Sequence, residues 1–358
     1  MAAFLGYSIS AVFLLPIPDI IGRKPSLISM SLVSIVTYFL FMFAQSLIQI
    51  YLLACVTGGT ILVRMTVAYI YALETVSSET QKKIVPCLII TEKLTIISIP
   101  IIMCITKSWL AIIIPFCCIS IFATAFIFFV PESQKFLCNK NQARAKEEQT
   151  SSTGRMFDRQ VAETTINGDK DQPQFMNNFK DCSKLLNLLI MICSWSFTSA
   201  GYYLVCYNVK YFEGSVYTNS ILFGVAGLIG VILFSILINL ISSKKLLISS
   251  FFLTLFGSVG YSATLQYPSL VPIWILFMVG SFSIQFSLCY YLNCELFQPA
   301  FRTRVYSICN FCSRSCSILS PLLSETLSNP IILISACSIL MLLLSLNLTP
   351  KPNYRSYS

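Results

Sequence analysis

Long uncharged apolar runs are the feature of this sequence that most restricts its fold. A helix that crosses the hydrocarbon core of a bilayer needs roughly 20 apolar residues, at about 1.5 Å of rise per residue. Backbone groups inside the bilayer must also be satisfied within the protein. The sequence therefore predicts an all-α polytopic membrane protein with about eleven transmembrane helices: Ala2–Pro16, Pro25–Phe43, Leu47–Leu73, Ile84–Ile105, Trp109–Val130, Leu185–Tyr207, Tyr217–Ile241, Leu246–Leu265, Leu270–Tyr291, Val305–Leu323 and Ile331–Leu346.

The first of these segments is short enough to be compared with a signal peptide. Ala2–Pro16 lacks a basic n-region, and Asp19–Lys24 follows it without an obvious small-residue cleavage site. We therefore expect a membrane helix at this position rather than a cleaved leader.

The composition gives no support to an enzyme. Only 11% of the residues are charged, against about 25% in an ordinary soluble domain. The chain has no histidine, and no nucleophile elbow, P-loop or dinucleotide fingerprint is present. Most of the fifteen cysteines lie in apolar runs, where they behave as small hydrophobes. Cys309, Cys312 and Cys316 contain one CxxC element without a second, so we expect no metal site and no cofactor.

The net charge of +9 is unevenly distributed between loops. One set of alternate loops holds only Lys107 and Lys210. The other set, which the positive-inside rule makes cytoplasmic, holds Arg23 and Lys24, Lys82 and Lys83, the run from Lys135 to Lys184, Lys244 and Lys245, Arg302 and Arg304, and Lys351 and Arg355. We therefore interpret the basic residues as a topology signal rather than a nucleic-acid surface, and expect the N-terminus outside and the C-terminus in the cytoplasm.

A polar stretch divides the predicted spans into groups of five and six. Cys138–Ser183 is rich in Lys, Glu, Gln, Asn and Thr and lacks the hydrophobicity to fold alone. The expected organisation is a transmembrane half over 1–137, a cytoplasmic linker over 138–183, a second transmembrane half over 184–348 and a cytoplasmic tail over 349–358.

A tight turn is expected immediately after the first span, in the sequence PDIIGRKP. Gly22 would permit the turn, Asp19 can accept hydrogen bonds from a neighbouring helix end, and Arg23 and Lys24 would seat the loop at the cytoplasmic surface. The segment resembles the cytoplasmic signature of the major facilitator superfamily, although Leu15 and Ile20 replace its usual Gly and Arg.

Further motifs resemble one family within that superfamily. Glu74 with Lys82 and Lys83 resembles an acidic-to-basic pairing between cytoplasmic helix ends. Glu132 and Ser133, in PESQKFL, match a motif shared by sugar porters and organic ion carriers. Glu295 and Arg302, in YLNCELFQPAFRTR, with Arg314 twelve residues later, look like the pattern of the organic cation, anion and zwitterion transporters, a solute carrier family. WSFTSAGYYL matches the start of that family's second half.

This resemblance implies a major facilitator fold in which the cavity lies between two six-helix halves. In the family's register, the chain begins inside the second helix, without the first helix and the large extracellular loop, as in an N-terminally truncated or divergent member. Pro350-Lys351-Pro352 stands where Pro-Glu-Thr is usual. The resemblance also implies location in the plasma membrane.

Arg314 is the strongest candidate for a substrate contact. It lies roughly 13 Å inside its span, deeper than a side chain can easily snorkel, and Phe311 shares its helical face. The resemblance implies that this position lines the central cavity, with Arg in anion carriers and Asp in cation carriers. A guanidinium there would attract carboxylates or sulfonates. The alternative is a structural salt bridge.

Three other charged residues interrupt apolar spans. Glu92 and Lys93 are consecutive, point about 100° apart and cannot form the usual i,i+4 pair. Either both reach the cytoplasmic interface, or Glu92 faces the cavity and pairs with Arg64 or Arg314. Arg64 has no recognised family counterpart, and a packing or interface role is equally open.

Aromatic residues on the sixth span are further candidates. Trp195 and Tyr202 share a helical face, with Tyr203 beside them, and such faces can hold flat organic substrates by stacking or cation–π contact. Core packing or an interfacial aromatic belt is the alternative.

These observations together predict secondary transport of organic ions by alternating access, with organic anions as the leading substrate class. An organic cation or zwitterion carrier is one alternative. A non-transporting truncated paralogue or regulatory partner is another. The expected partners are a small organic ion and the lipid bilayer, without nucleic acid, and the oligomeric state stays open.

Overall fold

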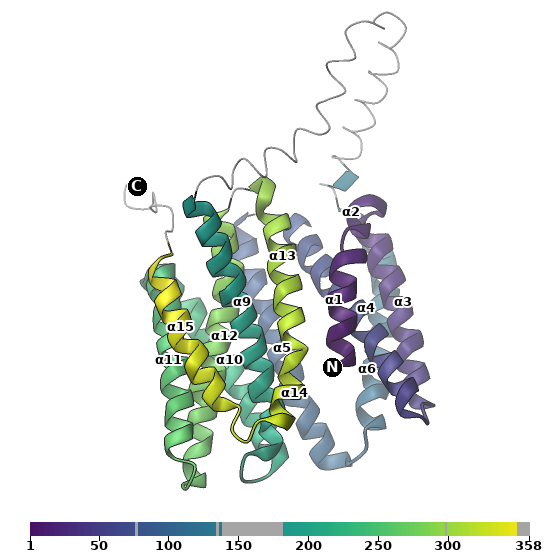
Figure 1. Ribbon diagram of the computed structural model, residues 1–358. Helices are drawn as coiled ribbons and strands as arrows, with labels where there is room; N and C mark the ends of the chain where they lie inside the picture. Colours follow the sequence, from purple (N-terminus) through teal and green to yellow (C-terminus); the bar gives the residue numbers. More distant parts are fainter. Residues whose placement is uncertain (76–77, 134–135, 138–181, 298, 349–358) are drawn as a thin grey trace, which may run out of the picture.

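The computed structural model describes residues 1–75, 78–133, 136–137, 182–297 and 299–348 (Figure 1). Within those ranges, the side chains at 19, 73, 78–86, 182–184, 294 and 299–304 lie outside the description. The described elements are all helices: α1 (Ala2–Phe13), α2 (Ile17–Ile21), α3 (Arg23–Met42), α4 (Leu47–Thr75), α5 (Ser78–Thr106), α6 (Leu110–Phe129), α9 (Cys182–Asn208), η2 (Val209–Tyr211), α10 (Val216–Leu240), α11 (Ser243–Ala263), η3 (Pro268–Leu270), α12 (Val271–Leu296), α13 (Pro299–Ser317), α14 (Leu319–Thr326) and α15 (Ile331–Leu346).

The long helices run side by side in one bundle (Figure 1). The short helix α2 and the beginnings of α9 and α13 lie at one end, which we call the α2 end. The other end, where α14 lies, is called the α14 end.

The apolar spans expected from the sequence are confirmed as helices of a multi-pass membrane protein. Eight described helices are long and apolar enough to cross a bilayer, and α1 and α15 are shorter apolar helices. Several boundaries differ from expectation by up to six residues. The first helix ends at Phe13 rather than Pro16. The expected span Val305–Leu323 is divided at Ile318 into α13 and α14.

Helix packing falls into two groups that meet along two seams. Helix α4 packs on α1 and α3, and α3 packs on α6, while α12 packs on α9, α10 and α11, and α11 on α15. The groups meet where α5 packs against α10 and where α1 packs against α13. These two seams are the largest contacts between the groups.

The outer surface of the bundle is apolar, whereas small polar side chains occupy many helix contacts. Phe122 and Phe129 are 77% and 86% exposed, as suits side chains that face lipid. Inside, the Ser34 hydroxyl donates to the Thr60 hydroxyl at 2.9 Å, and the buried Gln285 amide nitrogen donates to the Thr254 hydroxyl at 2.7 Å. Small hydroxyl residues allow close helix approach in a membrane, where apolar burial gives little driving force.

Candidate functional site

A carboxylate caps the first turn of α3 at the α2 end. Glu132, just after α6, accepts hydrogen bonds from the backbone N–H groups of Arg23 at 3.1 Å and of Lys24 at 3.2 Å. These N–H groups have no partner within their own helix, and a negative charge there also meets the positive end of the helix dipole. Glu132 therefore fastens α3 to α6.

The residue before this turn must be glycine. Gly22 has φ of 114°, and a Cβ atom placed on it would lie 2.6 Å from Glu132 Oε2. The backbone conformation disfavours any other residue, and a side chain there would displace the Glu132 carboxylate from its position.

Glu74, at the end of α4, joins the same cluster. One of its oxygens lies 3.4 Å from the Arg23 guanidinium, and the other accepts a 2.5 Å hydrogen bond from the Ser133 hydroxyl. The Lys24 ammonium donates to the backbone carbonyl of Phe128 at 2.8 Å. Side chains from α3, α4 and the end of α6 are thus tied together at one end of the bundle.

Three motifs that are far apart in the sequence meet in this α2-end cluster. The expected turn at Gly22, Arg23 and Lys24 is present and contacts Glu132 directly, while Ser133 contacts Glu74. Glu74 was expected to pair with Lys82 and Lys83, and its described partners are Arg23 and Ser133. The side chains of Asp19, Lys82 and Lys83 lie outside the described residues.

The second half has a related arrangement at the same end. The Lys244 ammonium, in the first turn of α11, donates to the backbone carbonyl of Leu346 at 2.7 Å. Glu295 Oε2, at the end of α12, is buried without a hydrogen-bond partner among the described residues. The side chain of Arg302, its expected companion, lies outside the description.

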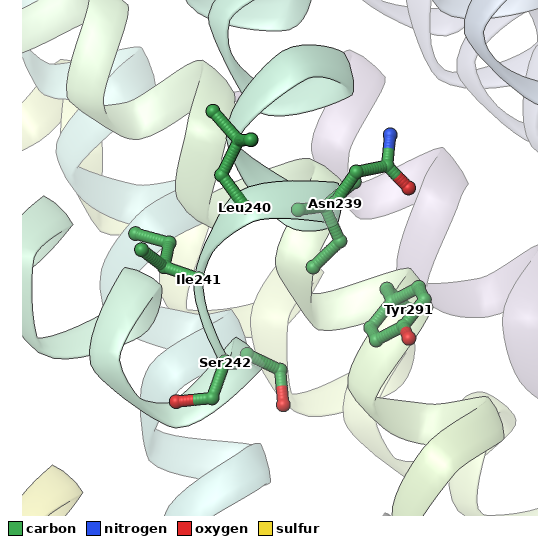
Figure 2. A pocket seen from close by; sticks show the side chains of 7 residues that line it. Asn239, Leu240, Ile241, Ser242 and Tyr291 are labelled. Atoms are coloured by element: carbon green, nitrogen blue, oxygen red, sulfur yellow. The ribbon is translucent and has the colours of Figure 1, made fainter. Parts of the chain in front are cut away.

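A cavity of about 270 Å³ lies beside this second arrangement. Figure 2 shows Ile241 and Ser242, on the turn between α10 and α11, with Asn239 and Tyr291. The cavity lies at this turn, and none of the residues expected to bind substrate lines it.

Arg314 lies deep in α13 between the two groups of helices. It is 8% exposed, and its Nη1 donates to the Tyr203 hydroxyl on α9 at 3.1 Å. Its guanidinium also sits 4.8 Å from the ring centre of Tyr7 on α1. Its Nε has no hydrogen-bond partner among the described residues. Arg314 therefore contacts one tyrosine from each half, and its Nε–H group has no acceptor among the described residues.

Lys93 provides a second buried cation, on the opposite half. It is 5% exposed on α5, and its ammonium lies 3.3 Å from the Tyr202 hydroxyl and 4.6 Å from the ring centre of Tyr202. The rings of Tyr202 and Tyr203 are 5.6 Å apart. The two adjacent tyrosines of α9 thus each contact one cation.

Glu92 and Lys93 do form a pair, contrary to the expectation from their adjacent positions. Lys93 Nζ lies 3.6 Å from Glu92 Oε1, and the Glu92 side chain is 39% exposed. Both side chains are long enough to bend toward each other across the 100° between them. Arg64 is not an ion-pair partner of Glu92 among the described contacts, and its Nη1 is buried without a hydrogen bond.

The other aromatic candidates occupy different surroundings. Trp195 is fully buried, with its ring 5.0 Å from that of Tyr290 and 5.4 Å from that of Tyr306. It was expected on the same helical face as Tyr202, with core packing as the alternative, and in this structure it is part of the packed core, two helical turns nearer the α2 end. Phe311 is 42% exposed, one turn from Arg314.

Sequence reasoning missed Lys93 and Tyr7 as site residues. Lys93 carries a recognisable signal, because a lysine inside an apolar run normally faces a partner or a cavity. Tyr7 carries no such signal, since a tyrosine in an apolar helix is common at interfaces and in cores.

Comparison with known proteins identifies the architecture. The sequence pattern of the Major Facilitator Superfamily matches residues 1–321. The inward-open xylose transporter XylE from E. coli aligns with a TM-score of 0.72 and 15% identity, over 99% of this chain and 86% of that chain. A D-xylose-proton symporter aligns with a TM-score of 0.70 and 14% identity, over 98% and 86%. Comparison with curated protein sequences gives no match. At such identities the structural likeness shows the fold alone.

Proposed function

The chain belongs to the major facilitator superfamily, and from this premise we propose that it carries small organic anions through a site centred on Arg314. Members of this superfamily are secondary transporters that work by alternating access, with the substrate near the bilayer midplane. The proposal adds the charge of the substrate and the residues that recognise it.

The observation that supports an anion is the surrounding of Arg314. Its described partners are the tyrosines Tyr203 and Tyr7, and no carboxylate in the described residues lies within ion-pair distance of it. A buried charge in a membrane protein is costly unless a partner compensates it. A carboxylate or sulfonate on the substrate would supply that partner and can bind a guanidinium through two parallel hydrogen bonds.

Aromatic side chains around Arg314 favour a substrate with a flat organic part. The ring of Phe4 lies 4.6 Å from that of Tyr203 in an edge-on arrangement, and Tyr202 is adjacent. Phe311 adds a partly exposed ring on the same helix as Arg314. Rings in this arrangement can stack on an aromatic or alicyclic group.

We further propose how the two halves move during transport. Residues 1–137 and 184–348 act as the moving halves, joined by 138–183, and slide at the α5–α10 and α1–α13 seams. The α2-end cluster holds the first half rigid. The α2 end faces the cytoplasm, with the N-terminus outside and the 349–358 tail inside, in the plasma membrane. The motifs from Glu295 to Arg314 favour an organic ion carrier.

Uptake of two tracers that differ only in charge tests the proposal. Purified protein in liposomes is expected to accumulate naphthalene-1-sulfonate and to exclude 1-naphthyltrimethylammonium. Arg314→Gln is expected to abolish sulfonate uptake, and Arg314→Lys to retain part of it. Lys107→Gln, which removes an exposed lysine at the end of α5, serves as the control. Undiminished uptake by Arg314→Gln would contradict the assignment.

One observation favours a cation or zwitterion carrier as the second candidate. Glu92 is a partly exposed carboxylate beside Lys93, and it could meet a positive group on a substrate. In that case 1-naphthyltrimethylammonium would be transported, and Glu92→Gln would abolish its uptake. Equal accumulation of both tracers in protein-containing and protein-free liposomes would instead support a non-transporting role.

A further inference from the structure

The charge of Lys93 is poorly compensated by its surroundings. An ammonium group has three donors, and the described partners of Lys93 are the Tyr202 hydroxyl at 3.3 Å and the Glu92 carboxylate at 3.6 Å. Both distances are long for charge-assisted hydrogen bonds, which are usually about 2.7–2.9 Å. Because the Glu92 side chain is 39% exposed, solvent weakens its attraction for Lys93.

The packing of α10 leaves space for the Lys93 stem. A Cβ atom on Gly227 would lie 3.3 Å from Lys93 Cδ and 3.6 Å from Cε, so the absence of a side chain there permits the lysine to cross the α5–α10 seam. Its ammonium thereby reaches Tyr202, on the other half. A lysine that snorkels to the membrane surface would not require this passage.

Lys93 and Arg314 are related through the tyrosine pair of α9. Lys93 contacts Tyr202 and Arg314 contacts Tyr203, while the two rings lie 5.6 Å apart. One cation belongs to the first half and the other to the second. A ligand that lies along the tyrosine pair could therefore meet a positive group at each end.

We propose that Lys93 is a second anion-binding residue of the transport site, so that the preferred substrates are aromatic anions with two separated acidic groups. This inference rests on the proposed function of Arg314. The first acidic group binds Arg314, and the second replaces Glu92 as the main partner of Lys93. Such a substrate links the two halves directly, whereas a monoanion leaves Lys93 with its long contacts.

Competition between naphthalene-1-sulfonate and naphthalene-1,5-disulfonate tests the proposal, because the two probes share a ring system and differ in one acidic group. Wild-type protein in detergent is expected to bind the disulfonate roughly tenfold more tightly, as one added charge-assisted hydrogen bond allows. Lys93→Gln is expected to remove that preference while it leaves monosulfonate affinity within about twofold. Lys93→Arg, which keeps the positive charge, is expected to retain much of the preference for the disulfonate.

Two controls accompany the measurement, and its outcomes separate the inference about Lys93 from the proposed function. Lys107→Gln changes an exposed lysine just after the same helix and is expected to keep the disulfonate preference. If wild type binds both probes equally, or if Lys93→Gln weakens both equally, the inference about Lys93 is overturned while the role of Arg314 stands. If wild type binds neither probe, the proposed function fails as well. Thermal denaturation of each variant reports whether the fold is retained.

Discussion

Lys24 and Lys244 make the same contact in the two halves of the chain. Each lies in the first turn of its helix, and each ammonium donates to a backbone carbonyl in the last turn of the last helix of its half: Phe128 at 2.8 Å and Leu346 at 2.7 Å. The two halves thus share one lysine contact at the α2 end. The likeness does not extend to the next residues, because the sequence after α15 has Lys351 where Glu132 follows α6.

Removing the charge of Glu132 is expected to destabilise the first half. Glu132→Gln keeps the shape of the side chain but weakens its hydrogen bonds to the N–H groups of Arg23 and Lys24 and its interaction with the dipole of α3. The expected loss is about 1–2 kcal/mol of folding free energy, measured as a lower denaturation temperature in detergent. Glu213→Gln, at an exposed loop carboxylate, is the matched control and is expected to change little.

Replacing Gly22 by alanine is expected to be more harmful than the same change at Gly214. Both glycines have positive φ, 114° and 104°, so both substitutions strain the backbone. Only at Gly22 would the new Cβ also press on the Glu132 carboxylate, at 2.6 Å, whereas at Gly214 the nearest atom is 3.9 Å away. We expect Gly22→Ala to lower the free energy of unfolding by at least about 1 kcal/mol more than Gly214→Ala does. Equal denaturation temperatures for the two variants would show that the α2-end cluster is not tightly packed.

Removing one hydroxyl is expected to weaken anion binding without changing the charge of the site. In Tyr203→Phe, the Arg314 guanidinium loses the oxygen that fixes its orientation at 3.1 Å. We expect affinity for naphthalene-1-sulfonate to fall roughly fivefold to tenfold, as for the loss of one hydrogen bond to a charged group. Tyr207→Phe, one turn further along α9, is the control, because no hydrogen bond of its hydroxyl is described. Similar affinities for all three proteins would mean that Tyr203 does not position Arg314.

The proposed orientation predicts which loops an impermeant reagent can reach in intact cells. In a cysteine-free background, Lys107→Cys at the α14 end is expected to react with a membrane-impermeant maleimide from outside. Lys245→Cys at the α2 end, also exposed, is expected to react only after the membrane is opened. The reverse pattern would place the α2 end outside and contradict the positive-inside interpretation.

The helices were largely predictable, because an apolar run long enough to cross a bilayer has few alternatives to a helix. The least predictable helix was α13, which begins at Pro299 and ends at Ser317, whereas its apolar run begins only at Val305. Its polar residues Asn310, Ser313 and Arg314 face other helices rather than lipid, so hydropathy marks neither its depth nor its ends.

The sequence indicated which residues lie in the α2-end cluster, but not which of them contact each other. The motifs around Gly22, Glu74 and Glu132 were recognised separately, yet which carboxylate meets which base depends on how three helix ends are arranged in space. Lys93 was harder still. The path of its side chain depends on Gly227, which lies in the other half. A glycine has no side chain, so nothing in the sequence indicates this contact.

The polarity of α13 has a consequence for how the protein is made. Its described part carries the polar residues Asn310, Ser313 and Arg314, and a charged side chain inside a membrane helix opposes insertion by up to roughly 2.5–3.5 kcal/mol. As it leaves the ribosome, α13 therefore has little tendency to enter lipid alone. Its entry depends on earlier helices that remain beside the translocon, above all α9, whose Tyr203 accepts a hydrogen bond from Arg314. The Tyr203 hydroxyl is therefore expected to matter for membrane insertion as well as for the proposed anion site.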